Sequence, residues 1–502
     1  MKKISHIITI FSFALFLITK GEAHGATTEV RGTWLTTTAN TAIATPADTE
    51  ASMRKLKDIG INTVYVESWK NGYTQFPSEV LQRTIGMRQR PVTIAQDPGD
   101  KSDSRPQNPR DLVQETLIEA HRNGLIYISW FEYGFMAAHK ETMNHLRRQK
   151  PEWLSRDVHG SEIAPNGFVW LNPLHPEARQ FLLDLVLEAI DHYDLDGVQL
   201  DDRIVWPHIT MGYDAYTQKI YAQEHAGRMP PKDHTNPEWM RWRADKVNEY
   251  AKLFVQEVRA KRPGLLISLS PAVYPWSWEH YLLEWPKWSA WTKADNIKTK
   301  NQATNSAPHW DEFIPQTYRF SYEDFAQSWM QQVDAMRTLG GDRQRALVAG
   351  IRIVGDGKDS SWDQLKRSIE LTRKLGNGGH VLWYSRGVLD LYPAELKTFY
   401  ASAGAASSPY FPIGWRNVSI PMQKGGTPAA KTGDKTIWQV SGLARANYRV
   451  IAADTEGWHY LDALSFSSVA ASGAQIDLAL PGRYTRIELL IDRRTEMLQA
   501  RP

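Results

Sequence analysis

The chain of 502 residues contains no cysteine. This absence excludes disulfides, thiolate metal sites and catalysis by a thiol nucleophile. The chain also lacks Gly-x-Gly-x-x-Gly and Gly-x-x-x-x-Gly-Lys motifs, so a nucleotide cofactor is not expected, and we predict no other cofactor. Neither His-Glu-x-x-His nor Gly-x-Ser-x-Gly occurs, which argues against a zinc peptidase and against a serine hydrolase.

The chain also lacks a large excess of positive or negative charge. The chain has 59 Lys and Arg residues against 56 Asp and Glu residues, a net charge of +3, and no long basic run. Nucleic acid is therefore not an expected partner. Aromatic residues are abundant, because Trp and Tyr each occur 20 times. Many belong in a core, but such rings also suit stacking on the apolar faces of sugars.

A hydrophobic run from Ile7 to Ile18 follows Lys2-Lys3 and precedes small residues around Ala23. This order predicts a secretory signal peptide over residues 1–23, and hence an exported protein that is periplasmic or secreted. The run is short for a membrane span, and no lipid-accepting cysteine follows it. We therefore expect no stable membrane association after cleavage; an uncleaved anchor is the alternative.

Eight predicted strands alternate with helical segments between residues 27 and 400. Strands separated by helices pair in parallel, and eight of them predict a (β/α)8 TIM barrel. The first helix is expected over Asp48–Ile59 with Asp48 as its N-cap, and a long, functional loop is expected over residues 87–108. The expected strands are Val30–Thr36, Ile61–Trp69, Leu125–Tyr133, Asp196–Asp202, Leu265–Ser270, Phe313–Tyr318, Ala346–Ile353 and Gly379–Ser385.

The residue pattern changes after residue 400, where helical periodicity ends. Small residues over 401–408 predict a linker, and short strand patterns over 409–502 predict a small all-β, sandwich-like C-terminal domain. Such a domain can bind glycan or cover one side of the barrel, and we favour the structural role.

The strand Asp196–Asp202 organises the candidate site. Strand alternation directs Gln199 and Asp201 to the inside of the barrel, with Asp202 just past the strand end. Carboxylates at the C-terminal ends of barrel strands are where enzymes of this fold carry their chemistry. The structural alternative is that Asp202 caps the next segment and Asp201 is a salt-bridged core acid.

Polar and aromatic residues at the other strand ends predict a cleft for a polyhydroxylated substrate. Histidines are scattered; Asp201, Asp202 and His208 could assemble a metal site, but we predict none. The residues predicted to bind substrate are Trp34, Glu67, Trp69, Asn71, Tyr133, Asn172, Gln199, Arg203, Tyr274, Gln316, Tyr318, Arg352 and Tyr384.

Glycosidic cleavage needs a proton donor and a carboxylate at the anomeric carbon. Asp201 is the candidate nucleophile or transition-state stabiliser. Glu132, flanked by aromatic residues, is the candidate acid with a raised pKa, and Asp202 is its rival; an arginine-paired or ligand-orienting Glu132 is equally plausible. In a substrate-assisted alternative, Asp201 and Asp202 suffice, because one orients an acetamido group and the other is the acid.

The barrel contains a series of ordered motifs, which are Val30–Trp34, Ile61–Val64, Trp130–Gly134, Trp170–Pro173, Asp196–Asp202, Ser270–Ala272 and Pro315–Tyr318. Together these motifs resemble the glycosyl-hydrolase-like family 10, whose members are exported bacterial TIM-barrel proteins. The resemblance implies hydrolysis of bacterial cell-wall glycan, as peptide-free peptidoglycan strands, or of a related amino-sugar polymer.

Two other functions stay open. Asp196-Gly197 followed by Asp201 is also similar to the nucleophile strand of α-amylase-type barrels, which suggests hydrolysis of a neutral exopolysaccharide or α-glucan. Against it, the strand Leu265–Ser270 ends without an acid. A non-catalytic glycan-binding barrel is the alternative from a different class.

Overall fold

The computed structural model describes residues 27–90, 110–299 and 306–411, and within the C-terminal part residues 419–421, 426–440, 446–455, 457–461, 468–471 and 476–492. The predicted signal peptide and most of the predicted loop over 87–108 lie outside the described residues. Among the described helices, none combines the length and the apolar character that crossing a membrane requires.

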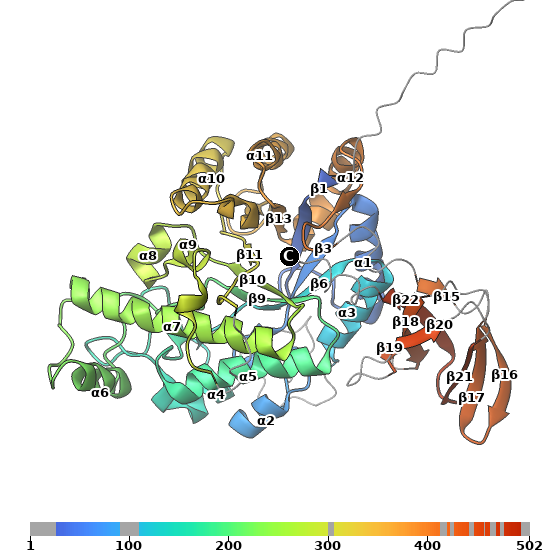
Figure 1. Ribbon diagram of the computed structural model, residues 1–502, viewed down its shortest axis with the longest axis horizontal. Coiled ribbons are helices and arrows are strands. Elements are labelled where there is room, and N and C mark those ends of the chain that lie inside the picture. Colours follow the sequence, from blue (N-terminus) through green and yellow to red (C-terminus); the bar gives the residue numbers. More distant parts are fainter. Residues whose placement is uncertain are drawn as a thin grey trace, which may run out of the picture.

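Eight parallel strands form one curled sheet, as the sequence predicts (Figure 1). Every strand except β11 pairs with the strand that follows it around the barrel, and β13 pairs back onto β2. The strands are β2 (Val30–Leu35), β3 (Thr63–Glu67), β6 (Ile126–Phe131), β9 (Gly197–Asp201), β10 (Leu266–Ser270), β11 (Glu312–Phe313), β12 (Ala349–Arg352) and β13 (Gly379–Trp383).

The sixth strand is shorter than predicted, because β11 spans only Glu312–Phe313 of the expected Phe313–Tyr318. Pro315 has no N–H to donate to a ladder, so a continuous strand cannot pass through it. Isolated parallel bridges, Phe313 with Leu347 and Gln316 with Gly350, connect this segment to the seventh strand instead. These bridges complete the circle of strands.

Helices cover the outside of the barrel, and short helices also lie within several of the loops that follow the strands (Figure 1). The first helix begins at Pro46, two residues before the prediction, because the Thr45 side chain accepts from the Asp48 N–H and is the N-cap. The helices are α1 (Pro46–Ile59), α2 (Glu79–Ile85), α3 (Leu112–Arg122), α4 (His145–Gln149), α5 (Pro176–His192), α6 (Ala215–Glu224), α7 (Pro237–Lys261), α8 (Trp276–Tyr281), α9 (Trp285–Trp288), α10 (Tyr322–Arg337), α11 (Trp362–Lys374) and α12 (Pro393–Ser402).

A hydrogen-bonded layer of side chains fills the barrel interior. The Trp34 indole N–H donates to Gln199 Oε1 (2.8 Å), and Gln199 Nε2 donates to Ser268 Oγ (2.9 Å). Ser268 and Tyr65 both donate to the Glu312 carboxylate, each at 2.8 Å. The predicted inward direction of Gln199 is therefore confirmed. These buried polar groups satisfy one another, so the interior is a packed core below the site.

The C-terminal strands form two small sheets, one built on β18 (Ala446–Asp454) and β22 (Arg486–Asp492) and one on β17 (Lys435–Val440). Trp438, Tyr448 and Leu489 from both sheets share one hydrophobic cluster, which agrees with the predicted sandwich-like domain. The other described strands of the two sheets are β15 (Ser419–Pro421), β16 (Gly426–Thr432), β19 (Gly457–Tyr460), β20 (Ser468–Ala471) and β21 (Ile476–Pro481).

The segment predicted as a linker is partly ordered against the barrel. Residues 401 and 402 close α12, and β14 (Ala406–Ser407) pairs in parallel with β1 (Thr27–Thr28). The chain therefore enters the C-terminal region from a strand pair at the start of the barrel.

Candidate active site

Asp201, the last residue of β9, lies at the bottom of the mouth of the barrel with both carboxylate oxygens bound. Arg203 Nη1 donates to Oδ2 (2.7 Å), and Gln316 Nε2 donates to Oδ1 (2.6 Å). Gln316 also donates to the Ser270 carbonyl (3.1 Å), so residues from the fourth, fifth and sixth strand ends hold one carboxyl in place. Only 4% of the Asp201 side chain is exposed.

Arg203 is surrounded by three carboxyl groups. Besides Asp201, its guanidinium lies 3.5 Å from Glu132 Oε1 and 3.7 Å from Asp202 Oδ1. Arg203 also donates to the Glu132 backbone carbonyl (2.8 Å) and lies over the Tyr133 ring. One cation therefore orients the acids that follow β6 and β9. Asp202 is the most accessible of the three, with 29% of its side chain exposed.

A second charged cluster, centred on Lys70, adjoins the first. Lys70 Nζ lies 3.0 Å from Glu67 Oε2 and 3.4 Å from Glu132 Oε2. The Thr37 hydroxyl and backbone N–H both donate to the Glu67 carboxylate. Glu67 is fully buried, and burial raises its pKa above the ordinary value although Lys70 and Thr37 act in the opposite direction. Glu132 thus lies between the two cations and joins the clusters.

The pKa values of the two aspartates and of Glu132 shift in opposite directions. Burial and the neighbouring Asp202 charge raise the pKa of Asp201 well above its ordinary value, and burial also raises the pKa of Asp202. Burial would raise the pKa of Glu132 too, but Lys70 and Arg203 lower it below its ordinary value. This corrects the prediction that aromatic surroundings raise the Glu132 pKa, because the nearby cations outweigh burial. The aspartate pair therefore favours the protonated form more than an exposed aspartate does, whereas Glu132 favours the ionised form.

Four aromatic rings pack together at the bottom of the mouth beside this pair. Tyr318 stacks on Trp383 with ring centroids 5.7 Å apart, and Trp34 lies 6.4 Å from Tyr318 and 6.3 Å from Trp130. Trp34 and Trp130 are buried, whereas Tyr318 and Trp383 are partly exposed. The exposed rings offer apolar surface to the face of a sugar.

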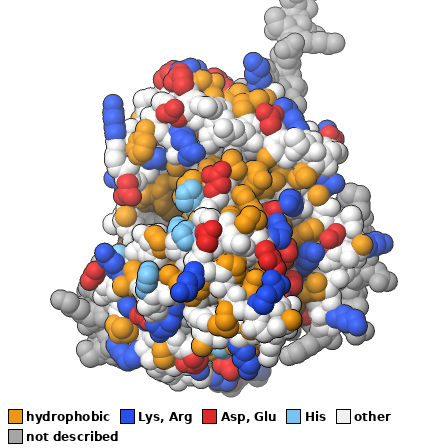
Figure 2. Space-filling model, turned by 90° about the vertical axis from the view of Figure 1, so that its left-hand side faces the viewer, with side chains coloured by type: hydrophobic (Ala, Val, Ile, Leu, Met, Phe, Trp, Pro, Cys, Tyr) orange, Lys and Arg blue, Asp and Glu red, His pale blue; other side chains and the backbone are white. Residues whose placement is uncertain are grey.

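The mouth opens on the side of the molecule where α6 and α8 follow the ends of β9 and β10. Figure 2 shows this side, where hydrophobic side chains surround a hollow and histidine and acidic side chains lie at its edge. A cavity of about 110 Å³ lies beside Asp202 and Arg203, with walls from Phe168, Trp170 and Tyr281.

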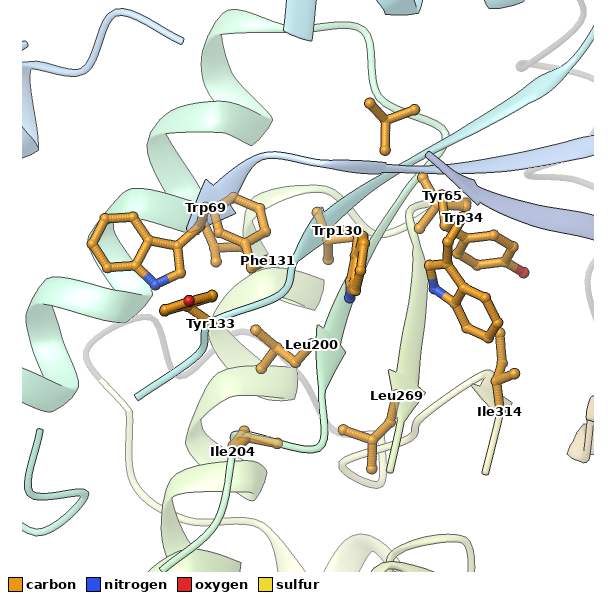
Figure 3. Close-up of a cluster of buried hydrophobic side chains, with 14 of the residues drawn as sticks. Trp34, Tyr65, Trp69, Trp130, Phe131, Tyr133, Leu200, Ile204, Leu269 and Ile314 are labelled. Carbon is orange, nitrogen blue, oxygen red and sulfur yellow. The ribbon is translucent and has the colours of Figure 1, made fainter. Parts of the chain in front are cut away.

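Several predicted binding residues lie elsewhere. Trp69 donates to the Gly134 carbonyl (3.1 Å) and packs edge-on against Phe181 of α5; Figure 3 shows it beside Phe131 and apart from Trp34. Asn172 is buried and donates to Asp214, the N-cap of α6. These positions correct the prediction that Trp69 and Asn172 bind substrate. They are structural residues.

The other residues predicted to bind substrate lie either inside the barrel or in the loops around its mouth. Gln199 is fully buried in the barrel interior beneath the site, so it is not exposed to substrate. Arg352 bonds to the Asp356 carbonyl (2.7 Å), and the Tyr384 hydroxyl donates to the Ala39 carbonyl (3.0 Å), so both shape rim loops. Tyr274 is partly exposed after β10, and Asn71 lies with φ of 53° in the turn between β4 (Trp69–Lys70) and β5 (Tyr73–Thr74).

Three features of the site were not predicted from the sequence: Lys70, Trp383 and the aromatic wall around Tyr281. Lys70 directly follows Trp69, so its position after the second strand was a usable signal. The dense aromatic stretch Trp276–Tyr281 after the fifth strand was another. Among the described residues, no group of three or more His, Asp or Glu side chains could hold a metal ion. His208 instead bonds to Thr210 and lies against Tyr281.

The chain is similar in sequence to known glycosyl hydrolase-like proteins. A model of the family described as Glycosyl hydrolase-like 10 matches residues 29–338. Glycosyl hydrolase YngK of Bacillus subtilis (strain 168) is 27% identical over 166 residues, covering 32% of this chain and 29% of that protein. Glycosyl hydrolase DigH of Escherichia coli (strain K12) is 25% identical over 224 residues, covering 43% of this chain and 45% of that protein. The match thus spans less than half the length of either relative.

Among solved structures, the PgaB (BpsB) glycoside hydrolase domain from Bordetella bronchiseptica superimposes with a TM-score of 0.52 at 12% identity. The superposition covers 74% of this chain and 98% of that domain. At this identity the likeness concerns the fold, which agrees with the barrel described above. Because the family model covers more than half of the sequence, the chain belongs to the Glycosyl hydrolase-like 10 family.

Proposed function

We propose that the chain is an exported glycoside hydrolase that cleaves bacterial cell-wall glycan, as peptide-free peptidoglycan strands, or a related amino-sugar polymer. The observation that carries the proposal is the pair Asp201 and Asp202 at the end of β9, held by Arg203 in a mouth with exposed aromatic rings. Membership of a glycosyl hydrolase-like family supports the reaction class.

The chemistry follows from the charge of the pair. Because burial and the neighbouring charge raise the pKa of Asp201, and burial raises that of Asp202, the pair keeps one proton at a pH where isolated aspartates are ionised. The protonated carboxyl donates its proton to the glycosidic oxygen as the bond from that oxygen to the anomeric carbon breaks. The ionised carboxylate stabilises the positive charge on that carbon until water adds to it, and the water gives its proton to the carboxylate that acted as the acid, which restores the pair.

Glu132 has a different role in this proposal. Its lowered pKa keeps it ionised between Lys70 and Arg203, so it does not supply the proton. Its negative charge adds to the rise in the pKa of both aspartates. We therefore assign Glu132 as a positioning residue that holds Arg203 and helps the pair to retain its proton.

Separate Asp201→Asn, Asp202→Asn and Glu132→Gln variants test these roles on peptide-free peptidoglycan strands. Each aspartate variant should lose about 10²–10⁴-fold in kcat, the usual contribution of a proton-transfer group. Glu132→Gln should retain activity with its pH–rate profile shifted to lower pH, because the pair loses a neighbouring negative charge. Full activity in a folded Asp201→Asn protein would contradict the proposal.

The alternatives predict other products. Cleavage of a neutral glucan but not of wall glycan would support the exopolysaccharide function. Saturable binding that survives Asp201→Asn and never yields new reducing ends would support a non-catalytic barrel.

A further inference from the structure

The cavity beside Asp202 is too small for a whole sugar ring with its neighbours. Its volume is about 110 Å³, whereas pockets that enclose drug-sized ligands measure roughly 300–1,000 Å³. A cavity of this size next to a candidate catalytic carboxyl accommodates a substituent on a sugar. We call it the Asp202 pocket, defined by Asn166, Trp170, Asp202, Ala272, Trp276 and Tyr281.

Two polar groups of opposite character face this pocket. Tyr281 accepts a hydrogen bond from Asn166 Nδ2 (3.2 Å), which leaves its hydroxyl proton able to donate. Asp202 Oδ1 is buried and accepts no hydrogen bond from the part of the chain that the structure describes, although Arg203 Nε lies 3.7 Å away. Asp202 therefore offers an acceptor and Tyr281 a donor, beside the Arg203, Asn166 and Ser277 side chains that also line the pocket.

Aromatic rings form much of the rest of the wall. Tyr281 packs against Trp276 (5.4 Å between centroids) and Trp170 (6.3 Å), and Trp170 Nε1 lies 3.4 Å from Asn166 Oδ1. These contacts connect α8 to β8 (Phe168–Trp170), so the wall comes from two separate loops of the rim. A methyl group packed between such rings is removed from water.

The surrounding charges disfavour an acidic substituent. A lactyl carboxylate in the pocket would meet Asp202, with Glu132 and Asp201 also close to Arg203. Arg203 is the cation at the pocket wall and already donates to Asp201 at 2.7 Å. A neutral group with an N–H, a carbonyl and a methyl matches the acceptor, the donor and the apolar wall. An acetamido group has these three features.

We infer that the Asp202 pocket binds the 2-acetamido group of the sugar whose bond is cleaved. Asp202 accepts the amide N–H, Tyr281 donates to the carbonyl oxygen, and the methyl group packs against the rings of Trp170 and Trp276. The inference rests on the proposed function and deepens it by naming the substituent that selects the substrate. It also gives the two aspartates different roles: Asp202 binds the substrate, and Asp201 carries the proton.

Binding to the full-length Asp201→Asn chain tests the pocket without requiring turnover. Isothermal titration compares a hexamer of N-acetylglucosamine with a hexamer of glucosamine. Charge alone would make this acidic site bind the cationic glucosamine hexamer more tightly. Tighter binding of the acetylated hexamer would therefore show that the Asp202 pocket recognises the acetamido group. We expect about tenfold or greater preference for the acetylated hexamer.

Two further substitutions in the Asp201→Asn chain show where the preference arises. Ala272→Leu fills the pocket and Tyr281→Phe removes its donor, so each should reduce the preference about tenfold or more. Ala335→Leu on α10 and Tyr213→Phe, which loses a hydrogen bond to the Pro231 carbonyl, are matched controls that should leave it unchanged.

Equal binding of the two hexamers, binding of neither, or a preference that survives both pocket substitutions would overturn the inference. Failure of the unsubstituted chain to hydrolyse any glycan would instead contradict the proposed function, and the titration would still decide what the pocket binds.

Discussion

At the scale of single residues, the site depends on two partly buried cations. Lys70 and Arg203 share Glu132 between them, and each holds a further carboxylate, Glu67 and Asp201 respectively. Removing the cation from a buried carboxylate strongly destabilises the fold. The carboxylate still carries the cost of its desolvation but no longer gains the attraction to the cation. The cations therefore set both the stability of the mouth and the protonation of its acids.

Lys70→Met should lower the free energy of unfolding by about 3–5 kcal/mol at neutral pH, because it leaves Glu67 and Glu132 without their shared cation. The loss should shrink as the pH falls, since both carboxyls can then protonate and no longer need the cation. Urea denaturation at pH 7 and at pH 4.5 measures the difference.

Lys366→Met is the matched control, because Lys366 makes an exposed ion pair with Glu370 (3.9 Å). Such pairs contribute at most about 1 kcal/mol. Equal destabilisation by the two substitutions would show that the Lys70 cluster has no special role.

Sequence reasoning found the aspartate pair because strand ends and adjacent carboxyls are visible in a single chain. It misjudged Glu132, because the Lys70 side chain that lowers the pKa comes from a different strand end. It also assigned Trp69 to substrate, although Trp69 turns outward onto α5. The direction of a side chain after the last strand residue depends on the loop backbone, which alternation does not predict.

At the scale of elements, a buried ion pair connects the first strand to the seventh helix of the barrel cycle. Glu29, between β1 and β2, bonds to Arg31 (2.6 Å) and to Arg373 of α11 (2.8 Å). Burial would raise the pKa of Glu29, but the hydrogen bond from Arg373 and the charges of both arginines lower it to about 2.

A lowered folded-state pKa means that Glu29 stabilises the fold above its ordinary pKa and that this contribution is lost as the pH falls toward 2. Glu29→Gln should therefore cost about 3 kcal/mol of unfolding free energy at pH 7, with a smaller cost below pH 4. Chemical denaturation across this pH range tests the prediction.

Glu50→Gln supplies the control, since Glu50 forms an exposed pair with Arg54 on α1 (3.6 Å). It should change stability by less than about 1 kcal/mol at any pH. A pH-independent cost for Glu29→Gln would contradict the assignment of its charge to the fold.

The order of elements was predictable, since β-strand and helix periodicities alternate clearly along the chain. The exceptions have local causes. Thr45 displaces Asp48 as N-cap because Pro46 favours the first helical position. Pro315 interrupts the sixth strand, and its closure through Gln316 and Gly350 depends on the neighbouring strand rather than on local sequence.

At the scale of the whole molecule, the C-terminal β domain is joined to the barrel through α3. Arg122 binds Glu488 and Glu119 and lies over the Trp458 ring (4.5 Å). Ile118 packs with Ile451 and Leu490, and His121 bonds to Tyr460 (2.7 Å). The contacts lie on the outside of the barrel, which supports a covering role for the domain.

Arg122→Met should weaken this junction by about 3–5 kcal/mol, because two largely buried carboxylates lose their cation. We expect faster cleavage by trypsin within residues 419–492, with the barrel fragment intact, as mapped by mass spectrometry. Arg486→Met is the control: Arg486 lies over the same ring (5.0 Å), and its loss should cost only about 0.5–1 kcal/mol. Unchanged proteolysis in Arg122→Met would contradict the docking account.

The central claim is that the aspartate pair hydrolyses wall glycan. The most direct measurement offers peptide-free peptidoglycan strands and intact sacculi to the protein side by side, with products identified by mass spectrometry. The account predicts saccharides with new reducing ends from the peptide-free strands and none when Asp201→Asn replaces the native chain. Release of no saccharide from either substrate, or equal release by the Asp201→Asn protein, would contradict it.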